Sequence, residues 1–160
     1  MPNPVDITVE EFAALLKGNG RLLGLDLGTK TIGLAISDSN WSIASPVRTI
    51  RRSKFTADVE ELLDYADKES VSGLVIGLPY NMDGSEGPRA QGTRAFVRNL
   101  SIKTDLPILY QDERLSSFEA EQTMLAANVS RAKRAQRIDA IAAGVILRSA
   151  LARLQSISSD

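Results

Sequence analysis

The order of apolar segments along the chain predicts an α/β fold with one mixed sheet covered by helices. Three strand-like segments follow one another within residues 21–50, which is typical of an antiparallel meander. From residue 55 onward, helical and strand-like segments alternate, as they do where helices cover the faces of a sheet. The 160 residues suffice for one domain with a substantial core.

The predicted strands are short apolar runs bounded by turn residues, and they cover 21–27, 31–37, 42–50, 73–78 and 107–111. Pro46 lacks a backbone N–H, so it favours an edge position or a bulge for the third strand. Thr8 and Glu11 have the spacing of a capping box and predict a short first helix that ends at Gly18. The other predicted helices cover about 55–66, 89–100 and 116–127, and a long final helix runs from about 138 to 154.

No internal linker or repeat divides the chain. We therefore expect an N-terminal extension with a short accessory helix at 1–20, one catalytic domain at 21–155 and a flexible tail at 156–160. The N-terminus lacks a basic start and an apolar core, so it does not resemble a signal peptide, and no apolar run approaches the length of a membrane span. These features favour a cytoplasmic protein without a membrane partner.

The chain contains neither cysteine nor histidine. This excludes disulfides, thiolate metal sites and the commonest general base and zinc ligand. Any metal ligands must come mainly from Asp and Glu, which favour hard cations such as Mg²⁺ or Mn²⁺. The net charge is −1, so a nucleic-acid partner would require a local basic patch.

Three separated segments carry acids in unusual positions. Asp26 lies within an apolar strand-like run, Glu113 follows Asp112 at the end of a predicted strand, and Asp139 stands early in an apolar helix. Side chains of neighbouring strand residues point to opposite faces, so only one of the adjacent pair, Asp112 and Glu113, is expected to face Asp26. Three acids brought together repel one another unless a divalent cation compensates them, which suggests a magnesium-type site and phosphodiester chemistry.

Each acid also has an ordinary structural interpretation. Asp26 could support the turn at Gly28, Glu113 could be a solvated loop acid, and Asp139 could be a helix N-terminal acid favoured by the helix dipole. The string Gly24–Thr29 also resembles the first phosphate loop of the actin, hexokinase and Hsp70 ATPases. The residues by themselves leave these alternatives open.

Basic residues near the acids could contact phosphates or could simply be solvated surface cations. The candidates for contact with a nucleic-acid backbone are Lys30, Arg89 and Arg114, together with the run Arg131, Lys133, Arg134 and Arg137 that precedes Asp139.

From about Arg21 to Leu154 the chain resembles the YqgF/RuvX family, the pre-16S rRNA nucleases related to the RuvC Holliday junction resolvases. Four blocks carry this resemblance through their order and spacing: 24–35 (GLDLGTKTIGLA), 75–85 (VIGLPYNMDGS), 112–117 (DERLSS) and 138–147 (IDAIAAGVIL). The family pattern usually has Thr after the Asp-Glu-Arg-Leu segment, and here Ser116 and Ser117 keep the hydroxyl groups.

The resemblance implies an RNase H-like fold with a five-stranded mixed sheet. It also implies that Asp26, Glu113 and Asp139 are the catalytic and metal-binding residues of a nuclease. In such a site two Mg²⁺ or Mn²⁺ ions, about 3.5–4 Å apart, activate the attacking water and neutralise the leaving oxygen. Asp26 is then the bridging ligand, Glu113 and Asp139 each complete one ion, and Asp83 is a weaker candidate for a fourth ligand.

The function expected from these features is metal-dependent hydrolysis of phosphodiester bonds in the 5′-end maturation of a 16S rRNA precursor. The expected partners are precursor rRNA and ribosomal particles, with the protein acting as a monomer or weak homodimer. The alternatives are a Holliday junction resolvase, which requires a dimer with two sites, a nucleotide-binding ATPase, and a non-catalytic RNA-binding protein of the same fold. An ATPase of the actin type needs two similar lobes, for which 160 residues leave no room.

Overall fold

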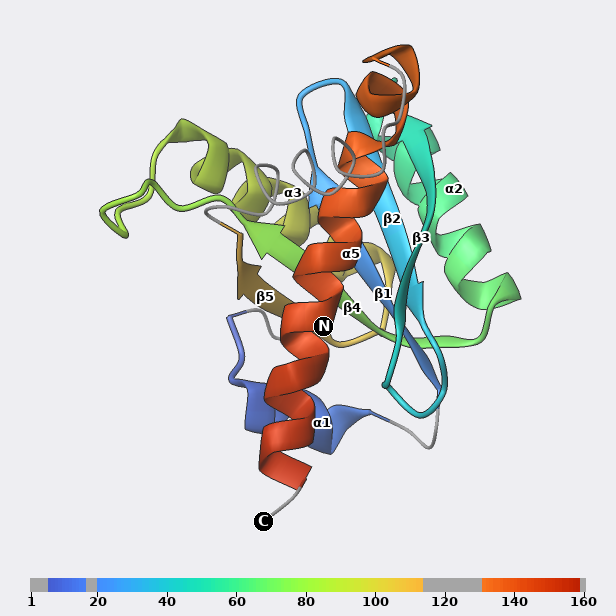
Figure 1. Cartoon of the computed structure of the whole chain (residues 1–160), viewed down its shortest axis with the longest axis vertical. Helices are drawn as coiled ribbons and strands as arrows, with labels where there is room; N and C mark the ends of the chain where they lie inside the picture. The colour runs from blue at the N-terminus through green and yellow to red at the C-terminus, as the bar shows by residue number, and fades with distance from the viewer. Residues whose placement is uncertain (1–5, 17–19, 114–130, 159–160) are drawn as a thin grey trace.

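A five-stranded sheet forms the centre of the molecule in the computed structural model, with helices on both faces (Figure 1). The structure describes residues 6–16, 20–113 and 131–158, with side chains in the last range from 138 to 157. Within these ranges the strands are β1 (Arg21–Leu27), β2 (Thr31–Ser37), β3 (Ala44–Arg51), β4 (Val71–Leu78) and β5 (Ile108–Asp112). The helices are α1 (Val9–Leu15), α2 (Phe55–Lys68), α3 (Pro88–Lys103) and α5 (Arg131–Ser158).

The strand order is β3-β2-β1-β4-β5. β1, β2 and β3 pair antiparallel, whereas β4 runs parallel to β1, and β5 runs parallel to β4. This mixed five-stranded sheet is the one expected from the sequence. The third strand begins two residues later and ends one residue later than predicted, and the predicted helix 116–127 lies outside the described residues.

Two apolar layers hold the helices against the sheet. On one face, the odd-numbered leucines of β1 pack with residues of α2 and α3, including Leu62 and Phe96. On the other face, Leu22, Val75 and Leu109 pack against α1 and α5. Because side chains alternate along a strand, each strand supplies both layers, and burial of both layers fixes the register of the sheet.

β3 is an edge strand of the described sheet, and it carries a bulge at Val47. Its register shifts there: Leu34 pairs with Arg48, but the next residue of β2, Ala35, pairs with Pro46. A bulge places two residues of one strand opposite one of its partner, and it tolerates the missing donor of proline. The prediction of an edge position or bulge at Pro46 is therefore confirmed on both counts.

Helix α1 begins as the sequence predicts. The Thr8 hydroxyl accepts a hydrogen bond from the Glu11 backbone N–H, and the Glu11 carboxylate accepts one from the Thr8 N–H. The helix ends at Leu15, before the predicted stop at Gly18, which lies outside the described residues. Phe12 is fully buried in the layer that includes α5, so this N-terminal helix belongs to the main core.

Helix α5 crosses one face of the sheet from end to end (Figure 1). Its segment Ile138–Ile157 is long and apolar enough to cross a membrane. The prediction that no apolar segment approaches the length of a membrane span is therefore wrong for this helix. Its apolar side is covered by the strands: Ala143, Ile146 and Leu147 are buried against the sheet, which makes α5 a core helix. The helix continues to Ser158, so residues 156–158, expected in a flexible tail, are helical.

Candidate active site

Asp26 lies near the carboxyl end of the central strand β1, on the face covered by α5. Alternation along the strand decides this placement, because Leu25 and Leu27 belong to the layer under α2 and α3. Gly24, two residues before Asp26, faces the backbone of α5 at Ala143 and Leu147. The Asp26 side chain is 3% exposed, so its carboxyl group is removed from water at the end of an apolar layer.

Glu113 reaches Asp26 by crossing over β4. It follows β5 directly, its backbone N–H donates to the Leu78 carbonyl over 3.2 Å, and its side chain is buried. Between β5 and β1 lies Gly77 of β4. A Cβ atom placed at Gly77 would come within 2.8 Å of the Glu113 carboxyl carbon. The absence of a side chain at Gly77 therefore leaves the path along which Glu113 approaches Asp26.

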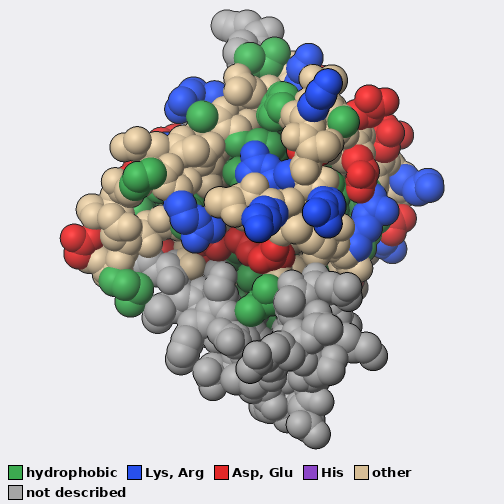
Figure 2. Space-filling model, turned by 90° about the horizontal axis from the view of Figure 1, so that it is seen from above, with side chains coloured by type: hydrophobic (Ala, Val, Ile, Leu, Met, Phe, Trp, Pro, Cys, Tyr) green, Lys and Arg blue, Asp and Glu red, His purple; other side chains and the backbone are tan. Residues whose placement is uncertain are grey.

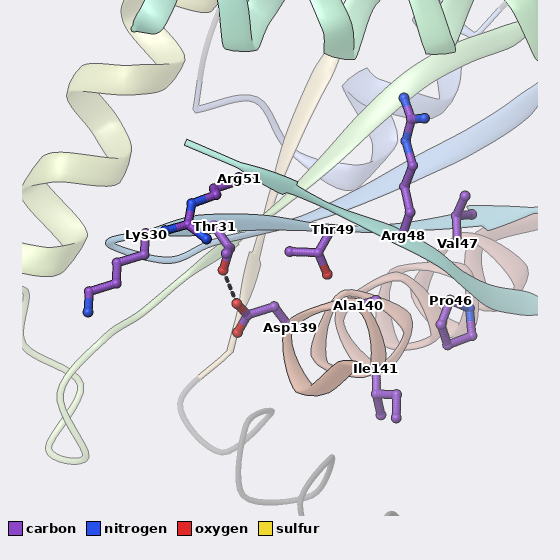
Figure 3. A pocket seen from close by; sticks show the side chains of 10 residues that line it. All are labelled: Lys30, Thr31, Pro46, Val47, Arg48, Thr49, Arg51, Asp139, Ala140 and Ile141. Atoms are coloured by element: carbon purple, nitrogen blue, oxygen red, sulfur yellow. Dashed lines mark hydrogen bonds between the residues drawn. The ribbon is translucent and has the colours of Figure 1, made fainter. Parts of the chain in front are cut away.

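Asp139 comes to the same place from the first turns of α5. The Thr31 hydroxyl on β2 donates a hydrogen bond to Asp139 Oδ2 (Figure 3). The backbones of α5 and β2 are in close contact here, because a Cβ at Gly33 would lie 2.0 Å from the Asp139 carbonyl oxygen. Gly33 is the pairing partner of Asp26 on β1, so this close approach brings Asp139 beside Asp26.

Burial and the two neighbouring acids raise the proton affinity of Asp26. Burial, the charge of Glu113 and a hydrogen bond with Glu113, and the charge of Asp139 raise the pKa of Asp26 to about 8, while Arg89 opposes this shift. A hydrogen bond between two carboxyl groups requires that one of them carry a proton. At neutral pH, the Asp26 carboxyl group therefore keeps its proton when no cation is bound to it.

Cations and an open cavity surround the acids. A cavity of about 560 Å³ is lined by Asp26, Asp139 and Thr31, together with Lys30 and Arg89. Arg89, at the start of α3, also lines a smaller cavity of about 240 Å³ that includes Glu113. Seen from above, Lys and Arg side chains gather on this face beside a patch of acidic side chains (Figure 2). Negative ligands can therefore approach the buried acids between cations.

The structure brings some of the remaining candidates to this site and leaves others away from it. Asp112 is exposed, whereas its neighbour Glu113 is buried, as the alternation of side chains predicts. Asp83 accepts hydrogen bonds from the Ser85 backbone and hydroxyl in the loop after β4, and it lines neither cavity around Asp26. Arg114 lies outside the described residues, as do the side chains of Arg131, Lys133, Arg134 and Arg137.

The donor set suits a hard divalent cation. All three acids offer carboxylate oxygens, and the chain has no histidine or cysteine to favour zinc. Among the described residues, no three acidic side chains are close enough together to hold one ion in common. Asp26 interacts with both of the other acids, Glu113 and Asp139.

Two residues of this site were not singled out from the sequence, Thr31 and Gly77. Gly77 interrupts the apolar run of β4, and a glycine inside a strand often marks a close approach of another group. That signal was available in the sequence. Thr31 begins β2 like many threonines in strands, and no sequence signal distinguishes the one that contacts Asp139.

The chain is similar to one protein family over most of its length. Residues 20–153 match the family model described as RuvX: Holliday junction resolvase. The chain belongs to the RuvX family. A protein of Rhizobium etli named "Putative pre-16S rRNA nuclease" is 59% identical over 152 residues, covering 95% of this chain and 93% of that protein. A protein of the same name from Agrobacterium fabrum is 56% identical, covering 95% of this chain and 96% of its own length. The RuvX relatives are thus named as nucleases, enzymes that hydrolyse phosphodiester bonds.

Solved structures support the fold of this RuvX protein. Thermus thermophilus RuvC, determined in complex with a Holliday junction and also separately, matches with a TM-score of 0.50 at 11% identity, covering 84% of this chain and 96% of RuvC. At that identity the likeness establishes the fold alone. It confirms the expected RNase H-like class, with a five-stranded mixed sheet flanked by helices.

Proposed function

We propose that this RuvX protein is a metal-dependent endonuclease in which Asp26, Glu113 and Asp139 are the catalytic and metal-binding residues. One observation carries the proposal: three acids distant in the sequence meet beside the carboxyl end of the central strand β1, where burial and the two neighbouring acids raise the pKa of Asp26 to about 8. Such an arrangement destabilises a fold unless a ligand compensates it. Divalent cations would neutralise the repulsion among the acids and would activate water for the hydrolysis of phosphodiester bonds.

Each residue has a definite task in this mechanism. Bound Mg²⁺ or Mn²⁺, with two ions as the expected number, lowers the pKa of the attacking water and neutralises charge on the leaving oxygen. Asp26, Glu113 and Asp139 would hold these ions, with Asp26 proposed as the ligand that the two ions would share. Thr31 fixes the orientation of the Asp139 carboxylate through its hydrogen bond. Lys30 and Arg89 line the cavity and bind the phosphate.

The substrate we propose is the 5′ region of a 16S rRNA precursor, either free or within a ribosomal particle. The names of relatives at 59% and 56% identity support this assignment. An enzyme with that substrate acts in the cytoplasm, as a monomer or weak homodimer. The run Arg131–Arg137 is the proposed backbone-binding segment, in which each lost phosphate contact lowers the log–log salt slope by about one unit.

A branched DNA substrate is the second candidate, because the matching family model is described as a Holliday junction resolvase. Cleavage of precursor 16S rRNA and of a four-way DNA junction should be compared in Mg²⁺, in Mn²⁺ and in EDTA. We expect RNA cleavage that requires either metal. Full activity in EDTA would refute the metal site, and junction cleavage without RNA cleavage would favour the resolvase.

A further inference from the structure

A second cavity adjoins the acidic site and lies between the edge strand β3 and the start of α5 (Figure 3). Its volume is about 550 Å³. Lys30, Thr31 and Asp139 line both this cavity and the one around Asp26, so the two spaces adjoin at the proposed catalytic centre. A phosphate bound through cations at Asp26 and Asp139 would therefore have its neighbouring nucleotide beside this second cavity, here named the β3–α5 pocket.

The walls of the β3–α5 pocket combine apolar surface with cations at one end. Pro46 from the bulge of β3 and Ala140 and Ile141 from α5 supply the apolar surface. Arg51 pairs with Thr31 across β2 and β3, on the face of the sheet that carries the acids, and it lines the pocket together with Lys30. A nucleotide has a flat base and a charged phosphate. The apolar surface of the pocket suits the base, and the cations at its end suit the phosphate.

The bulge at Val47 decides which side chains of β3 face this pocket. Before the bulge, Ser45 pairs with Ile36, whose side chain packs in the layer under α2. After it, Thr49 pairs with Gly33 and shares the face of Asp139, and Figure 3 shows its side chain directed toward α5. Arg48 also lines the pocket, but its guanidinium points the other way and lies 5.0 Å from the centre of the Tyr65 ring. Bulges commonly redirect side chains next to active sites.

We propose that the β3–α5 pocket binds the base of one unpaired nucleotide adjacent to the scissile phosphate. The inference rests on the proposed function for the position of that phosphate, and it adds a requirement: the substrate must be single-stranded at this nucleotide. In a duplex the base is stacked and paired and cannot enter a pocket in the protein. The enzyme thereby selects unpaired segments of a nucleic acid by shape.

The test fills the pocket and leaves the acids in place. Thr49→Trp puts an indole into it, whereas Ser45→Trp puts the same group on the opposite face of the same strand and serves as the control. Binding of a labelled single-stranded RNA and of the same RNA in a full duplex is measured by fluorescence anisotropy. We expect Thr49→Trp to weaken single-strand binding about tenfold, the scale of one stacked base. Ser45→Trp should keep the wild-type affinity, and duplex binding should not distinguish the two variants.

A second pair of variants changes charge instead of size, so its result does not depend on whether the indole of Thr49→Trp fits into the pocket. Arg51→Glu reverses the charge at the exposed rim of the pocket, and Arg148→Glu makes the same change at an exposed position of α5 that does not line the pocket. We expect Arg51→Glu to weaken single-strand binding several-fold more than Arg148→Glu at equal salt. Equal effects within both pairs of variants would overturn the pocket, whether or not the RNA is cleaved.

A cleavage assay tests the same pocket with RNA substrates in which one nucleotide beside the cleavage site lacks its base. Wild-type protein should lose about tenfold in rate at one such position, and Thr49→Trp should lose that discrimination. If no position matters to the wild-type enzyme, the pocket proposal is wrong while the nuclease proposal stands. Binding differences between Thr49→Trp and Ser45→Trp without any metal-dependent cleavage would instead support the pocket and refute the proposed function.

Discussion

Asp26 and Asp58 are equally buried, at 3% and 4% exposure, yet their surroundings are opposite. Asp58, in the first turn of α2, accepts hydrogen bonds from the backbone N–H and the hydroxyl of Ser53. Asp26 faces two other acids, and its burial together with these acids raises its pKa to about 8. Two aspartates of equal burial thus have different roles: Asp58 stabilises the start of α2, whereas Asp26 belongs to a cluster of acids that repel one another. Burial of an acid without a compensating donor, beside other acids, marks a candidate functional site, whereas burial with hydrogen-bond donors is a structural arrangement.

The strongest test of this contrast exchanges each carboxylate for an amide. Asp26→Asn should reduce metal-dependent RNA cleavage at least about a thousandfold, because it removes the shared metal ligand while keeping the side-chain shape. Asp58→Asn should keep the cleavage rate and lower the free energy of unfolding by about 1–2 kcal/mol, since the amide is a weaker acceptor. Cleavage assays and chemical denaturation measure the two effects, and similar activity losses in both variants would contradict the assignment of Asp26.

A smaller effect should follow from closing the path of Glu113. Gly77→Ala places a methyl group 2.5 Å from Ile146 Cδ1 and 2.8 Å from the Glu113 carboxyl carbon, so both side chains must shift, and a shift of the carboxylate disturbs its contact with Asp26. We expect cleavage to fall about a hundredfold. Gly92→Ala in α3 is the matched control, because nothing lies within 4 Å of its added carbon. That variant should keep full activity and gain about 0.5–1 kcal/mol of stability. Unchanged activity of Gly77→Ala would show that Glu113 needs no path across β4.

The metal-free protein should become less stable as the pH rises from about 4 to about 8. Asp26 ionises near the ordinary aspartate pKa of 3.8 in the unfolded chain, whereas the folded state keeps the proton until about pH 8. The folded state therefore binds more protons between these values, and its free energy of unfolding falls with rising pH. Denaturation in EDTA at several pH values measures this slope. Asp26→Asn should flatten it and stabilise the metal-free protein at pH 7, and a slope identical to the wild type would refute the raised pKa.

The smallest effect concerns the residue that orients Asp139. Thr31→Val keeps the shape of the side chain and removes the hydroxyl that donates to Asp139 Oδ2. Loss of one such hydrogen bond is worth about 1 kcal/mol, so cleavage should fall about fivefold. Thr31→Ser retains the hydroxyl and should restore most of the rate. If Val and Ser behave alike, the hydroxyl has no part in positioning Asp139.

Much of the fold could be predicted from the sequence because local patterns determine it. The limits of β1 and β2 follow from apolar runs ended by Gly28 and Asp38, and the start of α1 follows from the capping box of Thr8 and Glu11. The alternation of strand side chains also predicted that only one of Asp112 and Glu113 turns inward, and the family resemblance implied that it is Glu113, which is the buried one. Each of these features depends on neighbours within a few residues, which the sequence displays directly.

The sequence by itself determined which acids are available, the absence of histidine and cysteine, and hence the kind of cation that the chain can hold. Only the tertiary structure decided that Asp26, Glu113 and Asp139 meet, that Gly77 and Gly33 make room for them, and that Thr31 contacts Asp139. It also decided that the bulge in β3 opens a pocket beside them. The reason is that close approach between distant segments depends on strand order and helix position, which no local pattern encodes.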